Sequence, residues 1–191
     1  MQNVTLVPAT EFASFNKQYD YPKDILSTPA TFISTLSQKV QTWLQSIKSL
    51  QQIEIALHKA QTHVDSNTAF IFFNNDNVPI GSVFLEPLPE TIRTDWNLDN
   101  DLDTNSAVYM SRFMLDSKYI GNRIGDVMMR RIQELCLQKR SAIVLDTWEG
   151  NAKLRRFYER HGFVLCGVFP ETGDDGNDVY FVSCYVWNNR K

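Results

Sequence analysis

Residues 109–125 read Tyr-Met-Ser-Arg-Phe-Met-Leu-Asp-Ser-Lys-Tyr-Ile-Gly-Asn-Arg-Ile-Gly. The part up to Leu115 is typical of a strand, and an apolar pattern of helical period begins at Ile124. Between them lies a short loop with Gly121, and Gly125 follows in the first expected helical turn. Backbone N–H groups at a helix start lack partners within the helix, and the helix dipole adds positive potential there. The stretch therefore predicts a strand, a loop and a helix whose junction is an anion site suited to a pyrophosphate.

This loop has an equally supported interpretation without a ligand. Two glycines before a helix are common, and the loop is then a tight turn from strand to helix. As an anion site, Gly121 and Gly125 let a ligand approach the backbone closely, and Arg123 adds a cationic donor. The loop alone does not separate the two interpretations.

A second stretch, residues 145–163, reads Leu-Asp-Thr-Trp-Glu-Gly-Asn-Ala-Lys-Leu-Arg-Arg-Phe-Tyr-Glu-Arg-His-Gly-Phe. Asn151 stands where the N-cap of a helix is expected. Leu154 and Phe157 fall on one face of that helix, and Tyr158 borders it. Taken alone, Tyr158 is either a core tyrosine or a phenol that reaches a cleft beside the sheet.

Together the two stretches resemble the C-terminal signature of the GNAT superfamily of N-acetyltransferases, and the resemblance covers residues 106–169. The family loop, Arg/Gln-x-x-Gly-x-Gly/Ala, corresponds to residues 120–125. Gly125 matches its last position, whereas Ile120 and Arg123 depart from the polar residue and the first glycine. The family's Asn-x-x-Ala-x-x-(Phe/Leu)-Tyr element is kept at Asn151, Phe157 and Tyr158, with Leu154 in place of its alanine.

The resemblance implies acetyl-CoA as co-substrate and no metal. It implies that the bulged strand end pairs with pantetheine, that Tyr158 protonates or hydrogen-bonds the leaving thiolate, and that a general base or a water path removes the amine's proton. Glu86 is the first candidate for a general base and Asp146 the second, and a solvated strand end is an equally supported interpretation of Glu86. The residues implied to bind acetyl-CoA are Phe113, Met114, Leu115, Gly121, Asn122, Arg123, Ile124, Gly125 and Asn151.

Hydrophobic periodicity and turn residues predict the remaining elements. Strands are predicted at 4–8, 69–73, 79–85, 106–115, 142–145, 163–169 and 179–187, and helices at 32–50, 124–137 and 152–161. Strands joined through helices are parallel neighbours, and strands joined by short turns are antiparallel. The expected fold is a mixed α/β sheet with helices on both faces. The resemblance specifies a GNAT fold, with a mostly antiparallel sheet and one splayed parallel strand pair.

Composition limits the class of protein. The chain has 191 residues, of which 43% are hydrophobic, and this suits one domain over residues 1–191. Within it, residues 1–105 are expected on the acceptor side and residues 106–191 in the acyl-CoA half. The net charge of −3 without a basic run argues against nucleic acid. We expect a cytoplasmic protein, because no apolar run could span a membrane and no signal peptide is evident.

The cysteines and histidines show no metal pattern. Cys136 and Cys166 lie in apolar segments and are expected to be small core residues. His58 and His63 are five residues apart, so they do not share a helix face as zinc ligands would.

The function expected is transfer of an acetyl group from acetyl-CoA to a primary amine of a small molecule or peptide, in a ternary complex. A catalytically silent acyl-CoA sensor remains an alternative, as does a nucleotide binder, although a P-loop Lys-Ser/Thr is lacking. A homodimer is left open.

The stretch from Glu90 to Asp103 raises one further hypothesis about the acceptor. Its carboxylates would attract a cationic acceptor, and Trp96 would add a cation–π surface. A solvated acidic loop without a substrate role is the interpretation we favour. The acidic residues concerned are Glu90, Asp95, Asp99, Asp101 and Asp103.

Overall fold

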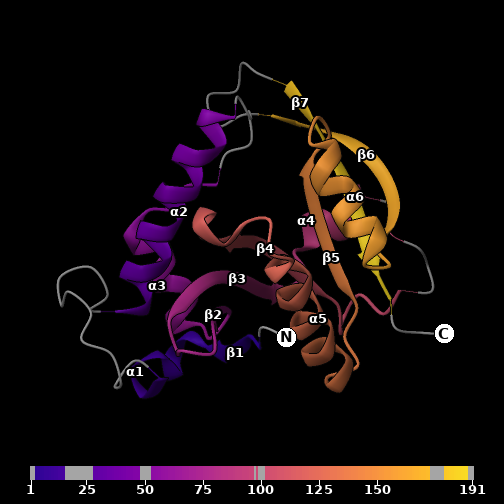
Figure 1. The fold of residues 1–191 in the computed structure, drawn as a ribbon. Coiled ribbons are helices and arrows are strands. Elements are labelled where there is room, and N and C mark those ends of the chain that lie inside the picture. The colour runs from indigo at the N-terminus through magenta and orange to yellow at the C-terminus, as the bar shows by residue number, and fades with distance from the viewer. Residues whose placement is uncertain are drawn as a thin grey trace. The chain divides into compact units, whose positions relative to one another are not determined.

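The computed structural model describes residues 3–15, 28–47, 53–96, 98, 102–172 and 179–188. Its strands are β1 (Thr5–Pro8), β2 (Ala69–Phe73), β3 (Pro79–Pro87), β4 (Val108–Leu115), β5 (Ile143–Trp148), β6 (Val164–Thr172) and β7 (Val179–Trp187) (Figure 1). Its helices are α1 (Phe12–Phe15), α2 (Pro29–Ser46), α3 (Leu57–Asp65), α4 (Glu90–Asp95), α5 (Ile124–Gln138) and α6 (Ala152–Arg160), with 3-10 turns η1 (Ala9–Glu11) and η3 (Ser117–Tyr119).

The strands follow the order β1-β2-β3-β4-β5-β7-β6 in a mixed sheet. Strands β4 and β5 are parallel, whereas β1–β2, β2–β3, β5–β7 and β6–β7 are antiparallel. The predicted mixed α/β class is therefore confirmed. Over the described part of the chain, no helix is both long and apolar enough to cross a bilayer.

The chain forms two compact units. Unit 1 comprises Met1–Leu85 and Arg112–Ile132, and unit 2 comprises Glu86–Ser111 and Gln133–Lys191. Strand β4 and helix α5 each contribute residues to both units. The units do not follow the division at residue 105, and the two functional halves proposed there stay a prediction.

The core of unit 1 forms because α2 presents an apolar face to the first strands. Thr28 caps this helix by accepting a hydrogen bond from the Thr31 amide at 3.1 Å, and Pro29 occupies its first turn. Helix α3 lies beside α2 (Figure 1). Hydrophobic periodicity does not predict α3, whose buried residues are Ala60 and Val64. The buried cluster includes Ile33, Leu36, Val40 and Leu44 of α2 with Ile71, Phe73 and Phe84.

The predicted hairpin between β2 and β3 is confirmed. The Asn74 side chain accepts hydrogen bonds from the amides of Asp76 and Val78, at 3.0 and 2.8 Å. Asn77 adopts a φ of 56°, the left-handed region that asparagine tolerates. Turn chemistry therefore fixes this connection, as its sequence indicates.

Unit 2 has its own core on one face of β5 and β7. Helix α4 ends just before Trp96, whose side chain is 4% exposed and stacks on Phe169 with 6.0 Å between ring centroids. The cation–π surface predicted for Trp96 is therefore wrong, because the indole is enclosed by apolar residues. They include Leu88, Leu98, Leu102, Ala107, Val144 and Val182.

The burial of the cysteines differs from the prediction. Cys136 and Cys184 are buried, whereas Cys166 is exposed, so its predicted core position is wrong. Strand β6 is the last in the sheet order, and its register with β7 shifts between Leu165 and Gly167. Cys166 is the extra residue of this bulge, which sequence periodicity does not reveal.

Candidate active site

The predicted anion loop lies in unit 1, between β4 and α5. The Asp116 amide donates to the Ile80 carbonyl at 2.9 Å and ties the end of β4 to β3. Asp126 and Val127 donate the first backbone hydrogen bonds of α5, both to the Arg123 carbonyl. The amides of Ile124 and Gly125 thus precede the helical ladder, as a helix N-terminus that receives an anion requires.

The backbone of this loop leaves room for a ligand. Gly121 has a φ of 93°, and a Cβ built on it meets no heavy atom within 4 Å. Gly121, Asn122 and Arg123 are exposed. Arg123 itself has a φ of 58°, a conformation that favours glycine. The GNAT pattern expects glycine at this position, so the arginine keeps the loop geometry and adds a positive charge beside it.

The strand before the loop carries a local distortion. Arg112 has a φ of 50°, directly before Phe113-Met114-Leu115, the segment expected to pair with pantetheine. Met114 is buried, whereas Phe113 and Leu115 are half-buried. A Cβ built on Gly81 would lie 2.5 Å from the Met114 carbonyl oxygen, so β3 needs glycine there. The residues predicted to bind acetyl-CoA at 113–115 and 121–125 all belong to unit 1.

Asn151 lies in unit 2 as the N-cap of α6. Its side chain accepts a hydrogen bond from the Leu154 amide at 3.1 Å, which confirms the capping prediction. The acetyl-CoA contact implied for Asn151 stays a prediction.

Tyr158 is buried in unit 2, with 5% of its surface exposed. Its ring centroid lies 5.6 Å from that of Phe163 and 6.1 Å from that of Tyr185. Burial raises the pKa of Tyr158, and the negative charge of Asp146 raises it further. Tyr158 is thus a packed tyrosine whose hydroxyl keeps its proton at neutral pH.

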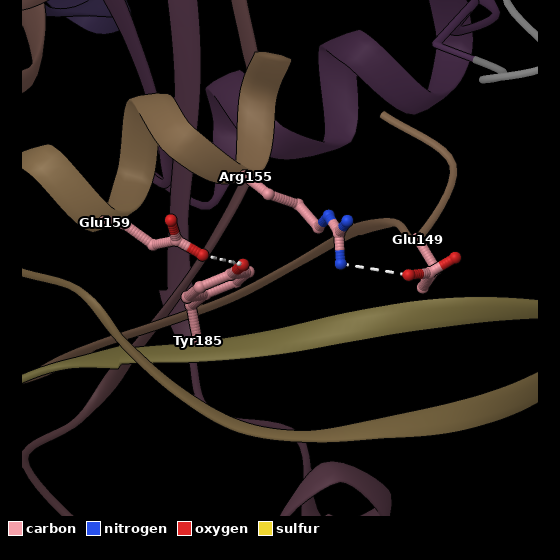
Figure 2. Close-up of polar contacts among 4 residues, drawn as sticks. All are labelled: Glu149, Arg155, Glu159 and Tyr185. Carbon is pink, nitrogen blue, oxygen red and sulfur yellow. Dashed lines mark hydrogen bonds and ion pairs between the residues drawn. The ribbon is translucent and has the colours of Figure 1, made fainter. Parts of the chain in front are cut away.

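Two polar contacts flank Tyr158 on helix α6. Arg155 pairs with Glu149 at 2.9 Å, and the Tyr185 hydroxyl donates to Glu159 at 3.1 Å (Figure 2). These contacts connect α6 to the preceding loop and to β7, so they fix the helix that carries Tyr158.

The two candidate bases also lie in unit 2. The Ser111 hydroxyl donates to Glu86 Oε2 at 3.4 Å, and the Tyr109 hydroxyl donates to Asp146 Oδ1. Sequence reasoning missed Tyr109, because the register that aligns β4 with β5 cannot be deduced from one strand's composition. The negative charge of Asp146 raises the pKa of Tyr158, which indicates that the carboxylate lies near the phenol.

The histidines and the acidic residues of the stretch from Glu90 to Asp103 also have expected roles. His63 stacks on Phe84 with 4.0 Å between ring centroids. Over the described residues, no three His, Cys, Asp or Glu side chains are grouped so that they could hold a metal ion. Asp103 accepts hydrogen bonds from the Asn105 amide and the Ser106 hydroxyl. Asp99 and Asp101 lie outside the described residues.

Comparison with known proteins identifies the family. The model of the acetyltransferase (GNAT) family matches residues 34–163. The spermine/spermidine N(1)-acetyltransferase of Bacillus subtilis is 35% identical over 72 residues, or 37% of this chain and 47% of that protein. The match therefore spans about half the length of this relative.

Two solved structures share the fold. A GNAT acetyltransferase from Listeria monocytogenes has a TM-score of 0.61 and 22% identity, covering 89% of this chain and 92% of that one. An acetyltransferase from Salmonella typhimurium, which modifies the N-terminal serine of a 50S ribosomal subunit protein, has a TM-score of 0.62 and 18% identity, covering 97% and 95%. With the matched family model, the conclusion is that the chain belongs to the GNAT family of acetyltransferases.

Proposed function

We propose that this protein transfers the acetyl group of acetyl-CoA to a primary amine by direct attack in a ternary complex. The observation that carries the proposal is the loop of residues 121–125, where Gly121, Asn122 and Arg123 are exposed and the amides of Ile124 and Gly125 come before the first backbone hydrogen bonds of α5. Amides with this orientation bind a pyrophosphate, and Arg123 adds a cationic donor. Residues 113–115 would pair with the pantetheine part of the co-substrate, which supplies the activated acetyl group.

Tyr158 would serve this reaction as a hydrogen-bond donor to the leaving sulfur. An ordinary thiol has a pKa of about 8.5, so a thiolate can leave near neutral pH without complete proton transfer. The raised pKa of Tyr158 makes its phenol a weak acid that stays protonated. It therefore stabilises the charge that develops on sulfur without losing its own proton.

A cationic polyamine is the acceptor class to test first. The Bacillus subtilis relative acts on spermine and spermidine, and its match to this chain is 35% identical over 72 residues. The stretch from Glu90 to Asp103 is acidic, which suits a polycation. Of its described carboxylates, Glu90 and Asp103 are exposed. A small polyamine would gain more from this charge than a neutral amine.

The test is an acceptor screen scored by release of the CoA thiol. Purified protein with acetyl-CoA would receive spermidine, single amino acids or a peptide with an N-terminal serine. We expect the highest kcat/KM with spermidine, decreasing as salt rises because exposed charges are screened over about 8 Å at physiological ionic strength. Calorimetry with acetyl-CoA, ATP and NAD identifies the bound nucleotide. Tight acetyl-CoA binding without thiol release from any amine would support the sensor alternative.

A further inference from the structure

Asp146 is the centre of a polar cluster in unit 2. It accepts a hydrogen bond from Tyr109 of β4, and its charge acts on Tyr158 of α6. In the antiparallel register Asp146 pairs with Cys184 of β7. Residues of three elements besides β5 therefore lie near this carboxylate, namely Tyr109 of β4, Tyr158 of α6 and Cys184 of β7.

The ladder between β4 and β5 explains how Tyr109 reaches Asp146. It joins Val108 to Ile143 and Tyr109 to Val144. Val144 and Asp146 are two residues apart on β5, so their side chains share one face of the strand. Tyr109 pairs with Val144, so its side chain lies on the same face, and its hydroxyl reaches the Asp146 carboxylate two residues further along β5. This contact lies at the end of the parallel ladder.

We propose that Tyr109 is a positioning residue, which holds the Asp146 carboxylate as the acceptor of the proton that the substrate amine loses. This inference rests on the proposed function. The amine nitrogen forms a bond to the acetyl carbon as one N–H proton passes to Asp146. The C–S bond breaks, and its electron pair remains on the sulfur, to which Tyr158 donates a hydrogen bond. Asp146 then releases its proton to solvent.

Asp146 lies two residues after Val144, the last β5 residue that pairs with β4, so it stands where these two strands stop pairing, and this place favours it over Glu86. A base and a donor for the leaving group must serve the same reaction centre, and Asp146 acts electrostatically on Tyr158. The hydrogen bond from Tyr109 keeps the carboxylate ionised, which is the form that accepts a proton, and lowers its proton affinity. Tyr109 also restricts the orientation of the carboxylate.

The pH dependence follows from the groups around Asp146. The titratable side chains near it include Tyr109 on β4, Tyr158 on α6 and Cys184 on β7, and Cys166 on β6 contacts Cys184. The hydrogen bond that the Cys184 thiol donates to Cys166, burial and the Asp146 charge raise the pKa of Cys184, and burial and Asp146 raise that of Tyr158. Both stay uncharged while the carboxylate titrates. Loss of the Tyr109 donor would raise the pKa of Asp146.

The experiment measures kcat and kcat/KM against pH with spermidine and acetyl-CoA. Asp146→Asn should lower kcat by about 10²–10⁴-fold, the usual contribution of general base catalysis. Tyr109→Phe should lower it about tenfold and displace the acidic limb to higher pH, with the acetyl-CoA Kd unchanged. Matched controls are Asp65→Asn on α3 and Tyr180→Phe on β7, both exposed positions.

A carboxyl ¹³C NMR titration of Asp146 gives a readout that does not need turnover. Its midpoint should rise in Tyr109→Phe, and an unchanged midpoint overturns the positioning role. Loss of activity in Glu86→Gln with full activity in Asp146→Asn overturns the choice of base. Wild-type protein that binds acetyl-CoA but acetylates no amine overturns the proposed function, and the proton-acceptor role with it. Circular dichroism confirms that each variant is folded.

Discussion

Arg123 lies directly before Ile124, the first residue of α5, with its backbone at a φ of 58°. A residue with a Cβ loses about 1–2 kcal/mol in this left-handed conformation, whereas glycine adopts it readily. The GNAT loop pattern has a glycine here. The arginine therefore combines a strained backbone with a positive charge at the anion loop, and the two effects can be separated by substitution.

Arg123→Gly should raise the free energy of unfolding by about 0.5–1 kcal/mol, because relief of strain exceeds the added entropy of glycine in the unfolded chain. It should also weaken acetyl-CoA binding by about tenfold, since a charge-assisted contact is lost. Denaturant unfolding and calorimetry measure the two changes. Arg123→Ala is the control, with the affinity loss but no gain in stability. A Kd equal to that of the wild type would exclude the cationic contact.

Gly125→Glu should abolish acetyl-CoA binding. The substitution places bulk and a negative charge in the first turn of α5, beside the amides proposed to bind the pyrophosphate. Gly125→Gln adds nearly the same bulk without the charge, so it should bind more tightly than Gly125→Glu. Calorimetry gives the affinities and thermal unfolding confirms folding. Unchanged affinity in folded Gly125→Glu would show that the pyrophosphate binds elsewhere.

Most of the fold could be predicted from periodicity and turn chemistry. The Asn74–Asn77 turn and the Asn151 cap depend on local hydrogen bonds that the sequence encodes directly. The sequence allows Thr28 or Thr31 to cap α2, and in the structure Thr28 does so. Strand β5 extends to Trp148, beyond the predicted end at residue 145, because its last residues pair with β7. Such extensions depend on distant partners and have no local signal.

The candidate site was less predictable. Two residues at positive φ, Arg112 and Arg123, lack the glycine that normally marks such a backbone. The Tyr109 contact with Asp146 depends on a register between strands that lie far apart in the sequence. The exposed position of Cys166 likewise follows from a bulge. In each case tertiary pairing decides the conformation, and local pattern does not.

Tyr158→Phe should lower kcat more than it weakens acetyl-CoA binding. The hydrogen bond to sulfur strengthens as charge develops, so its loss affects the transition state more than the bound state. A buried hydrogen bond to a charged group contributes about 1.5–3 kcal/mol, which corresponds to roughly 10–150-fold in kcat. Single-turnover kinetics isolates the chemical step, and Tyr180→Phe is the control. Full turnover in Tyr158→Phe under these conditions would contradict the role.

Gly81→Ala should destabilise the protein by about 1–3 kcal/mol, the usual effect of overpacking. The new Cβ would lie 2.5 Å from the Met114 carbonyl oxygen and 2.6 Å from Met128 Cε. Met128 can change rotamer, but the Met114 carbonyl belongs to the backbone of β4 and must shift. Denaturant unfolding measures the change.

The neighbouring Ser82 provides the control for Gly81→Ala. Its side chain is buried, and its hydroxyl has no hydrogen-bond partner among the described residues. Ser82→Ala should therefore leave stability unchanged or raise it, because a buried unsatisfied hydroxyl is removed. Equal stability of Gly81→Ala and the wild type would show that β3 and β4 separate easily at this point.

The wild-type protein should lose stability above about pH 10, and Tyr185→Phe should lose less. The Tyr185 side chain is buried and its hydroxyl donates to Glu159 at 3.1 Å (Figure 2). Burial, followed by this hydrogen bond, raises the pKa of Tyr185 to about 12. Below the unfolded-state value of about 10, both states keep the proton and the stabilisation is complete. Between about pH 10 and 12 the unfolded chain binds fewer protons, so stability falls as pH rises, by at most about 1.4 kcal/mol per pH unit. Tyr158, whose pKa is also raised, contributes in the same direction and remains in the variant.

Guanidinium unfolding near pH 9, 10 and 11 measures the free energy of unfolding of the variant and of the wild type. The difference between them should shift in favour of the variant as the pH rises. Tyr180→Phe, at an exposed position, should follow the wild type. Parallel losses in Tyr185→Phe and the wild type would mean that ionisation of Tyr185 is not coupled to unfolding.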